Sequence, residues 1–174
     1  MAETIRELIS EQKVDKRIEE LGKQISEDYA GKSIHLICIL KGGSFFMCEL
    51  AKRITVPVSI DFMSVSSYGN ATSSSGNIKI KKDLDDPIEG KEVLVVEDII
   101  DSGRTLHYLT KILKERGAKS VRLCTLLDKP ERREVEVKTD YVGFQIPDEF
   151  VVGYGLDYAQ KYRTLPYIGV VEGV

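Results

Sequence analysis

Residues 93–106 read VLVVEDIIDSGRTL, the most informative part of the sequence. It starts as an uninterrupted apolar run, which is typical of a strand that a parallel sheet buries on both faces. Glu97 and Asp98 then interrupt the run. Burying two adjacent carboxylates without partners is costly, so we expect them at the carboxyl edge of the sheet, where hydroxyls, a cation or water can satisfy them. A plain solvated strand end is the alternative at this point.

The same stretch continues into a tight turn. The sequence DSGRT, residues 101–105, combines a glycine that permits close backbone approach with two hydroxyls, and a helical pattern follows it. Free backbone N–H groups and the positive end of the helix dipole favour a phosphate at such a turn. Carboxylates for a sugar diol beside amides for a phosphate predict a ribose 5-phosphate site. The P-loop pattern is missing, and GYG at 153–155 lacks the third glycine of a dinucleotide fingerprint.

Strand and helix patterns alternate around this stretch. Apolar side chains recur at three- and four-residue steps over 14–29, which predicts an amphipathic helix with the charges of the first thirty residues on its outer side. We expect a second helix from Ser44, as its cap, to about Ile54, and a third from 106 to about 117. Strands are expected over 34–40, 58–68, 77–84, 93–100, 120–127, 141–146, 150–154 and 167–171. The alternation predicts an α/β fold with a mainly parallel central sheet, whose ligands bind beyond the carboxyl ends of the strands.

Composition narrows the class of protein. The 174 residues suit one domain, and the net charge of −3 gives no sign of a polyanion-binding surface, so we expect no nucleic-acid partner. No apolar stretch approaches the ~18 residues of a membrane span, and the charged first thirty residues do not resemble a signal peptide. The three cysteines are interpreted as small buried hydrophobes in a reducing compartment, and the two histidines are assigned to neither metal nor catalysis. We expect a cytoplasmic protein without a membrane partner.

Several motifs agree in order with one family. Residues 95–106, together with LKGG at 40–43, SY at 67–68, LDK at 127–129 and VGFQIPDEFVVGYGLDY at 142–158, resemble the hypoxanthine-guanine phosphoribosyltransferases, in particular their bacterial branch. The resemblance covers nearly the whole chain. It implies the type I phosphoribosyltransferase fold as one domain over 1–174, with a core at about 30–130. It also implies a small hood, formed by the N-terminal segment and about 140–174, and a mobile lid loop.

The resemblance implies a sugar and phosphate half of the site. Asp101 would lie near purine N7 and act in proton transfer there; a simple helix N-cap is the alternative for this residue. The ribose and 5-phosphate would be bound by Glu97, Asp98, Asp101, Ser102, Gly103, Arg104 and Thr105.

A pyrophosphate half is implied as well. The pyrophosphate would be bound by Lys41, Gly42, Ser67, Tyr68 and Arg163. The first two belong to a loop that in the family often contains a strained, sometimes cis, peptide, although a Gly-Gly turn with a surface lysine is the alternative. Residues 66–77 form a long polar stretch of small residues, which is usually either functional or disordered, and by resemblance it is the lid that excludes water.

The purine would be bound by Lys129, Phe150, Val151 and Asp157, and Mg²⁺ by Glu97, Asp98 and Asp157. The Lys129 ammonium would donate to the 6-oxo oxygen, which favours 6-oxopurines over adenine. Phe150 would stack on the base; taken by itself, a phenylalanine is more often a core residue, and only the surrounding motif reverses this reading.

The implied activity is that of a magnesium-dependent pentosyltransferase of purine salvage. Hypoxanthine or guanine and phosphoribosyl pyrophosphate would give IMP or GMP and pyrophosphate through an oxocarbenium-like transition state, in a homodimer or homotetramer. Two alternatives stay open. One is a transferase that prefers xanthine, and the other is a phosphoribosyl pyrophosphate-sensing, RNA-binding regulator built on the same fold.

Overall fold

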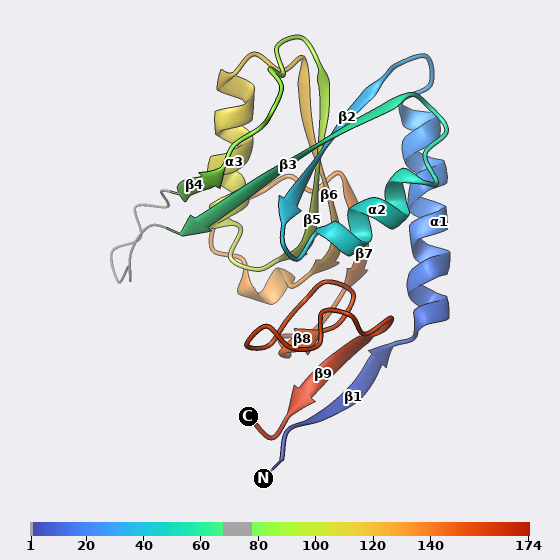
Figure 1. Cartoon of the computed structure of the whole chain (residues 1–174), viewed down its shortest axis with the longest axis vertical. Coiled ribbons are helices and arrows are strands. Elements are labelled where there is room, and N and C mark those ends of the chain that lie inside the picture. Colours follow the sequence, from blue (N-terminus) through green and yellow to red (C-terminus); the bar gives the residue numbers. More distant parts are fainter. Residues whose placement is uncertain (1, 68–77) are drawn as a thin grey trace.

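The computed structural model describes residues 2–67 and 78–174. Its larger sheet has six strands in the order β4-β3-β2-β5-β6-β7, all parallel except β4, which runs antiparallel to β3 (Figure 1). The strands are β2 (Ile34–Leu40), β3 (Val58–Ser67), β4 (Ile78–Lys82), β5 (Glu92–Ile100), β6 (Ser120–Asp128) and β7 (Tyr141–Gln145). The predicted α/β class and the mainly parallel central sheet are confirmed.

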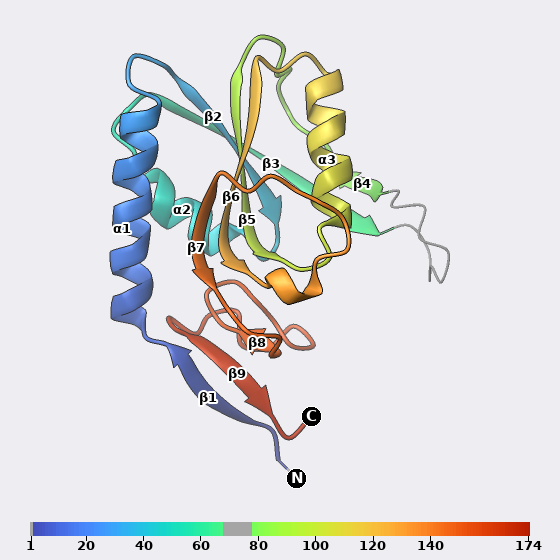
Figure 2. The ribbon, with the colours of Figure 1, turned by 180° about the vertical axis from the view of Figure 1, so that it is seen from behind.

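Helices cover both faces of this sheet. Helices α1 (Glu11–Asp28) and α2 (Ser44–Ala51) pack on one face and α3 (Arg104–Glu115) on the other, and a short 3₁₀ turn, η1 (Pro130–Arg132), follows β6 (Figure 2). The alternation of side chains along each strand sends one set into each layer, so that Leu94 and Val96 of β5 meet α1 and α2 while Val93 and Val95 meet α3. These apolar runs form strands because both of their faces are buried.

A second, three-stranded antiparallel sheet has the order β1-β9-β8, with β1 (Thr4–Ile9), β8 (Val151–Val152) and β9 (Ile168–Glu172). It lies beyond the carboxyl ends of the parallel strands of the larger sheet (Figure 1). The prediction that the charges of the first thirty residues lie on a helix is wrong for residues 4–9. The partner of β1 is β9, at the other end of the chain, and no local pattern indicates so distant a pairing.

Four smaller expectations also need correction. Gly43, not Ser44, is the N-cap of α2, and the helix ends at Ala51 rather than Ile54. Cys38 and Cys124 are buried as expected, whereas Cys48 is exposed on α2. The lid predicted for 66–77 begins inside β3, and its residues 68–77 lie outside the described part of the chain.

Among the described residues, no helix is long and apolar enough to cross a membrane.

Candidate active site

The acidic pair lies where β5 loses one of its neighbours. Pairing of β2 with β5 ends at Cys38 and Val96, while β6 continues beside β5 to Ile100. The carboxylates beyond this point accept backbone N–H groups, from Asp98 to Glu97 Oε1 at 3.1 Å and from Ile99 to Asp98 Oδ1 at 2.7 Å. Both side chains line a cavity of about 270 Å³ together with Gly42 and residues 99–103. The predicted edge position is therefore confirmed.

Glu97 is the more deeply buried of the two acids. Burial raises its pKa well above the ordinary value, and the adjacent Asp98 carboxylate raises it further. A cation in this cavity would lower the pKa of Glu97 again, because a nearby positive charge favours the ionised carboxylate.

The turn after β5 leaves the start of α3 open. Gly103 is the N-cap, with a φ of 85°, which is a left-handed conformation that suits glycine. No side chain among the described residues caps this helix, although the Arg104 N–H lies 3.3 Å from Ser102 Oγ. The first-turn amides thus point to a place where an anion is favoured. Asp101 is two residues before the N-cap, so its reading as a helix cap is wrong, and its carboxylate is 49% exposed.

The pyrophosphate loop and the acidic edge are in contact. The Leu40–Lys41 peptide is cis, Lys41 is exposed, and Gly42 packs so closely on Asp98 that a Cβ there would overlap Asp98 Oδ2. On its other side, a Cβ on Gly155 would overlap the Gly42 carbonyl oxygen. Gly42 is therefore the meeting point of the larger sheet with the loops around β8.

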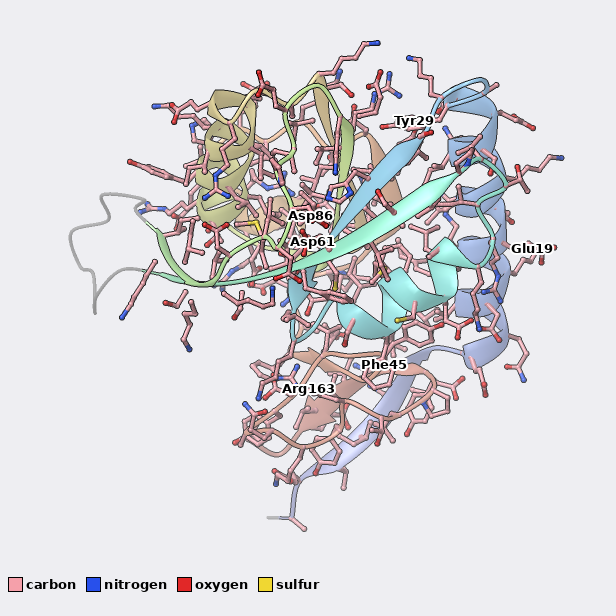
Figure 3. The ribbon with its side chains drawn as sticks, turned by 45° about the horizontal axis from the view of Figure 1, so that its top comes forward. Glu19, Tyr29, Phe45, Asp61, Asp86 and Arg163 are labelled. Atoms are coloured by element: carbon pink, nitrogen blue, oxygen red, sulfur yellow. The ribbon has the colours of Figure 1, made fainter. Side chains whose placement is uncertain are left out.

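Those loops carry Asp157 and Arg163. Arg163 Nη1 donates to the Gly155 carbonyl at 2.6 Å, and its Nη2 lies 3.3 Å from Asp157 Oδ1. Asp157 Oδ2 accepts the N–H of Gln160 at 2.8 Å. Figure 3 shows Arg163 among the loops between the two sheets. The structure brings both residues to the same end of the larger sheet as Gly42.

Backbone strain marks this segment as well. Non-glycine residues with positive φ are Tyr154, Ala159, Gln160 and Tyr162, at 50°, 51°, 66° and 76°. Such conformations each cost of order 1–3 kcal/mol and cluster where function over-determines the backbone.

The residues predicted to bind the purine lie on separate elements of the structure. Lys129 directly follows β6, donates its N–H to the Ile100 carbonyl at 3.0 Å, and holds its Nζ 3.7 Å from Asp148 Oδ1. Phe150 is 50% exposed and contacts Tyr158 edge to face at a centroid distance of 5.5 Å, so its reading as a core residue is wrong. Val151 is buried in β8, where it pairs with β9.

The structure adds residues that the sequence did not single out. Arg132 lies 3.6 Å from Asp101 Oδ1 and 3.5 Å from Asp148 Oδ2, while Arg133 contacts the Asp101 carbonyl and the Asp128 carboxylate. The only hint of these contacts in the sequence is the pair of adjacent arginines shortly after the LDK motif. Several acids along the chain could have been their partners, and only the fold selects among them.

The predicted pyrophosphate contacts of Ser67 and Tyr68 stay predictions. Ser67 ends β3, but its side chain and the whole of Tyr68 lie outside the described residues.

Within the described chain, no group of three or more His, Cys, Asp or Glu side chains is arranged to hold a metal ion. Mg²⁺, however, is ordinarily bound by one or two carboxylates together with substrate phosphates, so Glu97 and Asp98 on one cavity wall fit it without a protein cage.

Comparison with known proteins agrees with this geometry. The phosphoribosyl transferase domain family matches residues 5–159. The chain is 53% identical over 165 residues to the hypoxanthine-guanine phosphoribosyltransferase of Bacillus subtilis, which covers 95% of this chain and 92% of that protein. It is 56% identical over 165 residues to the bifunctional protein TilS/HprT of Listeria monocytogenes, but spans only 26% of that longer protein.

A solved structure shows the same architecture. The crystal structure of a hypoxanthine-guanine phosphoribosyltransferase from Bacillus anthracis matches with a TM-score of 0.93 and 51% identity, over 96% of this chain and 99% of that one. The acidic strand end, the open helix start and the family match over residues 5–159 agree, and this chain belongs to the phosphoribosyltransferase family with the type I fold.

Proposed function

We propose that this chain is a purine-salvage phosphoribosyltransferase, which joins hypoxanthine or guanine through N9 to C1 of phosphoribosyl pyrophosphate and releases pyrophosphate. The observation that carries the proposal is the packing of Gly42 between Asp98 and Gly155. This contact joins a sugar-binding edge to a pyrophosphate loop and to the loops with Asp157 and Arg163, as a reaction at C1 between sugar and pyrophosphate requires.

The sugar and its phosphate would be held along β5 and α3. Glu97 and Asp98 would accept hydrogen bonds from the ribose hydroxyls. The amides of residues 102–105, at the open start of α3, would bind the 5-phosphate, which the helix dipole favours. Arg104 would contribute through its backbone, because its side chain forms an ion pair with Glu134.

The leaving pyrophosphate would meet cationic and amide groups. Arg163 would supply positive charge, and the loop at Lys41 and Gly42 would supply backbone contacts, which stabilise the charge that develops in the transition state. Glu97 and Asp98 would hold Mg²⁺ beside the ribose, and Asp157 would contact Mg²⁺ bound to pyrophosphate, their oxygen atoms being the donors that this cation prefers. The cation, when bound, neutralises part of the pyrophosphate charge.

The base would lie between Phe150 and the end of β6. Phe150 presents an exposed ring on which a purine can stack, the Lys129 ammonium would donate to the 6-oxo oxygen, and the Val151 backbone would bind the ring edge. As the N9–C1 bond forms and the bond from C1 to pyrophosphate breaks, the purine loses its N7 proton, which the half-exposed Asp101 carboxylate would accept.

A xanthine-preferring transferase would use the same groups and differ around the purine 2-position. A phosphoribosyl pyrophosphate-sensing regulator needs only the sugar and phosphate half, so the purine groups argue against it. We further propose that the chain is a single domain with the three-stranded sheet as its hood, which is smaller than the predicted 140–174 because β7 pairs with β6 in the larger sheet. Assembly as a homodimer or homotetramer and a cytoplasmic location stay predictions.

An initial-rate absorbance assay tests the proposal. Hypoxanthine, guanine, xanthine and adenine are each supplied with phosphoribosyl pyrophosphate, with and without Mg²⁺. We expect metal-dependent turnover of hypoxanthine or guanine and none of adenine. Binding of phosphoribosyl pyrophosphate without turnover of any base would replace the proposal by the regulator, and faster turnover of xanthine would replace it by the xanthine enzyme.

A further inference from the structure

Arg133 joins the purine end of the site to Asp101 through one guanidinium group. Its Nη2 forms an ion pair with Asp128, the last residue of β6, and its Nε lies 3.3 Å from the backbone carbonyl oxygen of Asp101. The two side chains are 21% and 7% exposed, so the pair is shielded from water. Lys129 is the residue after Asp128, and one guanidinium therefore touches the segments that carry both Lys129 and Asp101.

The residues that follow Arg133 hydrogen-bond to the turn at residues 101–103. The N–H groups of Glu134 and Val135 both donate to the Ser102 carbonyl, at 2.9 and 3.1 Å. A Cβ built on Gly103 would lie 2.9 Å from Arg133 Cδ, which shows how closely the stem of the arginine covers the turn. The main chain of residues 101–103 is thus held from one side by residues 133–135.

We propose that Arg133 is a positioning residue for Asp101, an inference that rests on the proposed function. The Asp101 carboxylate projects into solvent at 49% exposure, with Arg132 as an exposed neighbour at 3.6 Å. Its direction is consequently set mainly by its main chain, whose carbonyl Arg133 holds. Catalytic groups must be held within a fraction of an ångström of their productive geometry.

A purely structural role is the competing explanation. Asp128 is a buried carboxylate, and removing its cationic partner leaves an uncompensated charge in the protein. Arg133→Lys distinguishes the two roles. A lysine keeps a positive charge for Asp128, but its single ammonium lacks the rigid fork that reaches Asp128 and the Asp101 carbonyl together.

The decisive test is a double-mutant cycle between Arg133→Lys and Asp101→Asn, with kcat measured at saturating hypoxanthine and phosphoribosyl pyrophosphate. In the parent enzyme we expect Arg133→Lys to lower kcat about 10- to 100-fold, since a displacement of ~1 Å costs up to ~100-fold. In the Asp101→Asn background it should lower kcat less than about 3-fold, because the group that it positions has already lost its function.

A matched control comes from Arg116→Lys. Arg116 forms a more exposed arginine–aspartate ion pair with Asp83, at 2.7 and 2.8 Å, at the far end of α3 from the turn. We expect this variant to leave kcat within about 2-fold of the parent. If Arg133→Lys unfolds at a much lower temperature than the control, the cycle is repeated with Asp128→Asn/Arg133→Gln, which removes both charges and leaves neither unpaired.

Each result decides between the roles. Equal losses in both backgrounds, or an unchanged kcat in Arg133→Lys, would overturn the positioning role alone. If Asp101→Asn by itself turned over at the parental rate, the proton-transfer role proposed for Asp101 would be overturned. The positioning role of Arg133 would then be overturned as well. Loss confined to the background that retains Asp101 supports the proposal.

Discussion

Replacing Gly155 by alanine tests the contact on which the proposed function rests. Gly155 has a φ of +101°, and a Cβ there would overlap the carbonyl oxygen of Gly42. Gly90 offers a matched control, because it has a φ of +75° and, apart from its two chain neighbours, no described residue has an atom within 4 Å of a Cβ built on it. Both alanine variants carry left-handed backbone strain. Only Gly155→Ala also pushes on the pyrophosphate loop.

The two effects differ in size and in kind. A left-handed conformation costs an L-residue about 1–2 kcal/mol. For a chain of this length that corresponds to a fall in Tm of roughly 2–8 °C, which is the whole effect expected of Gly90→Ala. Gly155→Ala should lose at least as much stability. In addition Gly42 must move, and a displacement of ~1 Å near the reacting groups should lower kcat/KM for phosphoribosyl pyrophosphate about 10- to 100-fold.

The assay pairs thermal unfolding with initial rates at varied phosphoribosyl pyrophosphate and saturating hypoxanthine. We expect Gly155→Ala to unfold at a temperature no higher than that of Gly90→Ala, with the fall in kcat/KM confined to Gly155→Ala. If Gly155→Ala and Gly90→Ala had equal kcat/KM, the contact between Gly155 and Gly42 would have no part in holding the site together, and the reasoning would be refuted.

Asp61, Cys38 and Lys129 each supply a further test. Burial alone would raise the pKa of Asp61, but three backbone N–H donors outweigh burial and lower it. The carboxylate therefore stabilises the fold above its unfolded pKa of about 3.9, and this contribution is lost as pH falls through the folded pKa. Asp61→Asn should lower the free energy of unfolding, measured in urea, by about 1–3 kcal/mol at pH 7 and by less below pH 4; equal losses at both pH values would contradict this. Burial raises the pKa of Cys38 to about 12, so iodoacetamide at pH 8 should modify exposed Cys48 and leave Cys38 free, as mass spectrometry of the native protein would show. Lys129→Gln should lower kcat/KM for hypoxanthine about 10- to 150-fold, the cost of losing a charged hydrogen bond; an unchanged value would remove Lys129 from the purine site.

Local patterns predicted the centre of the fold well. The run at 93–100 and the turn at 101–105 carry their information within a few residues, and the structure places the acids at the edge of the sheet and a helix directly after the turn. A resemblance was needed for Phe150, because a single aromatic residue is more often part of the core, whereas this ring is exposed in the structure.

Distant pairings were beyond local reasoning. Strand β1 depends on β9 at the other end of the chain, and its sequence TIRELI carries too many charges to indicate a strand by itself. The contacts of Arg133 likewise depend on the parallel pairing of β5 with β6, which sets Ile100 beside Asp128 and leaves Asp101 one residue beyond. The chain offers many acids to this arginine, and only the folded sheet determines which of them it meets.

The most direct test of the account is a time course of IMP and pyrophosphate from hypoxanthine, phosphoribosyl pyrophosphate and Mg²⁺, followed by chromatography for the parent chain and for Asp101→Asn. We predict that the parent forms the two products in equal amounts, and that Asp101→Asn forms them at a rate about 10²- to 10⁴-fold lower, the range over which general acid–base groups act. Parental rates in Asp101→Asn, or pyrophosphate released without IMP, would contradict it.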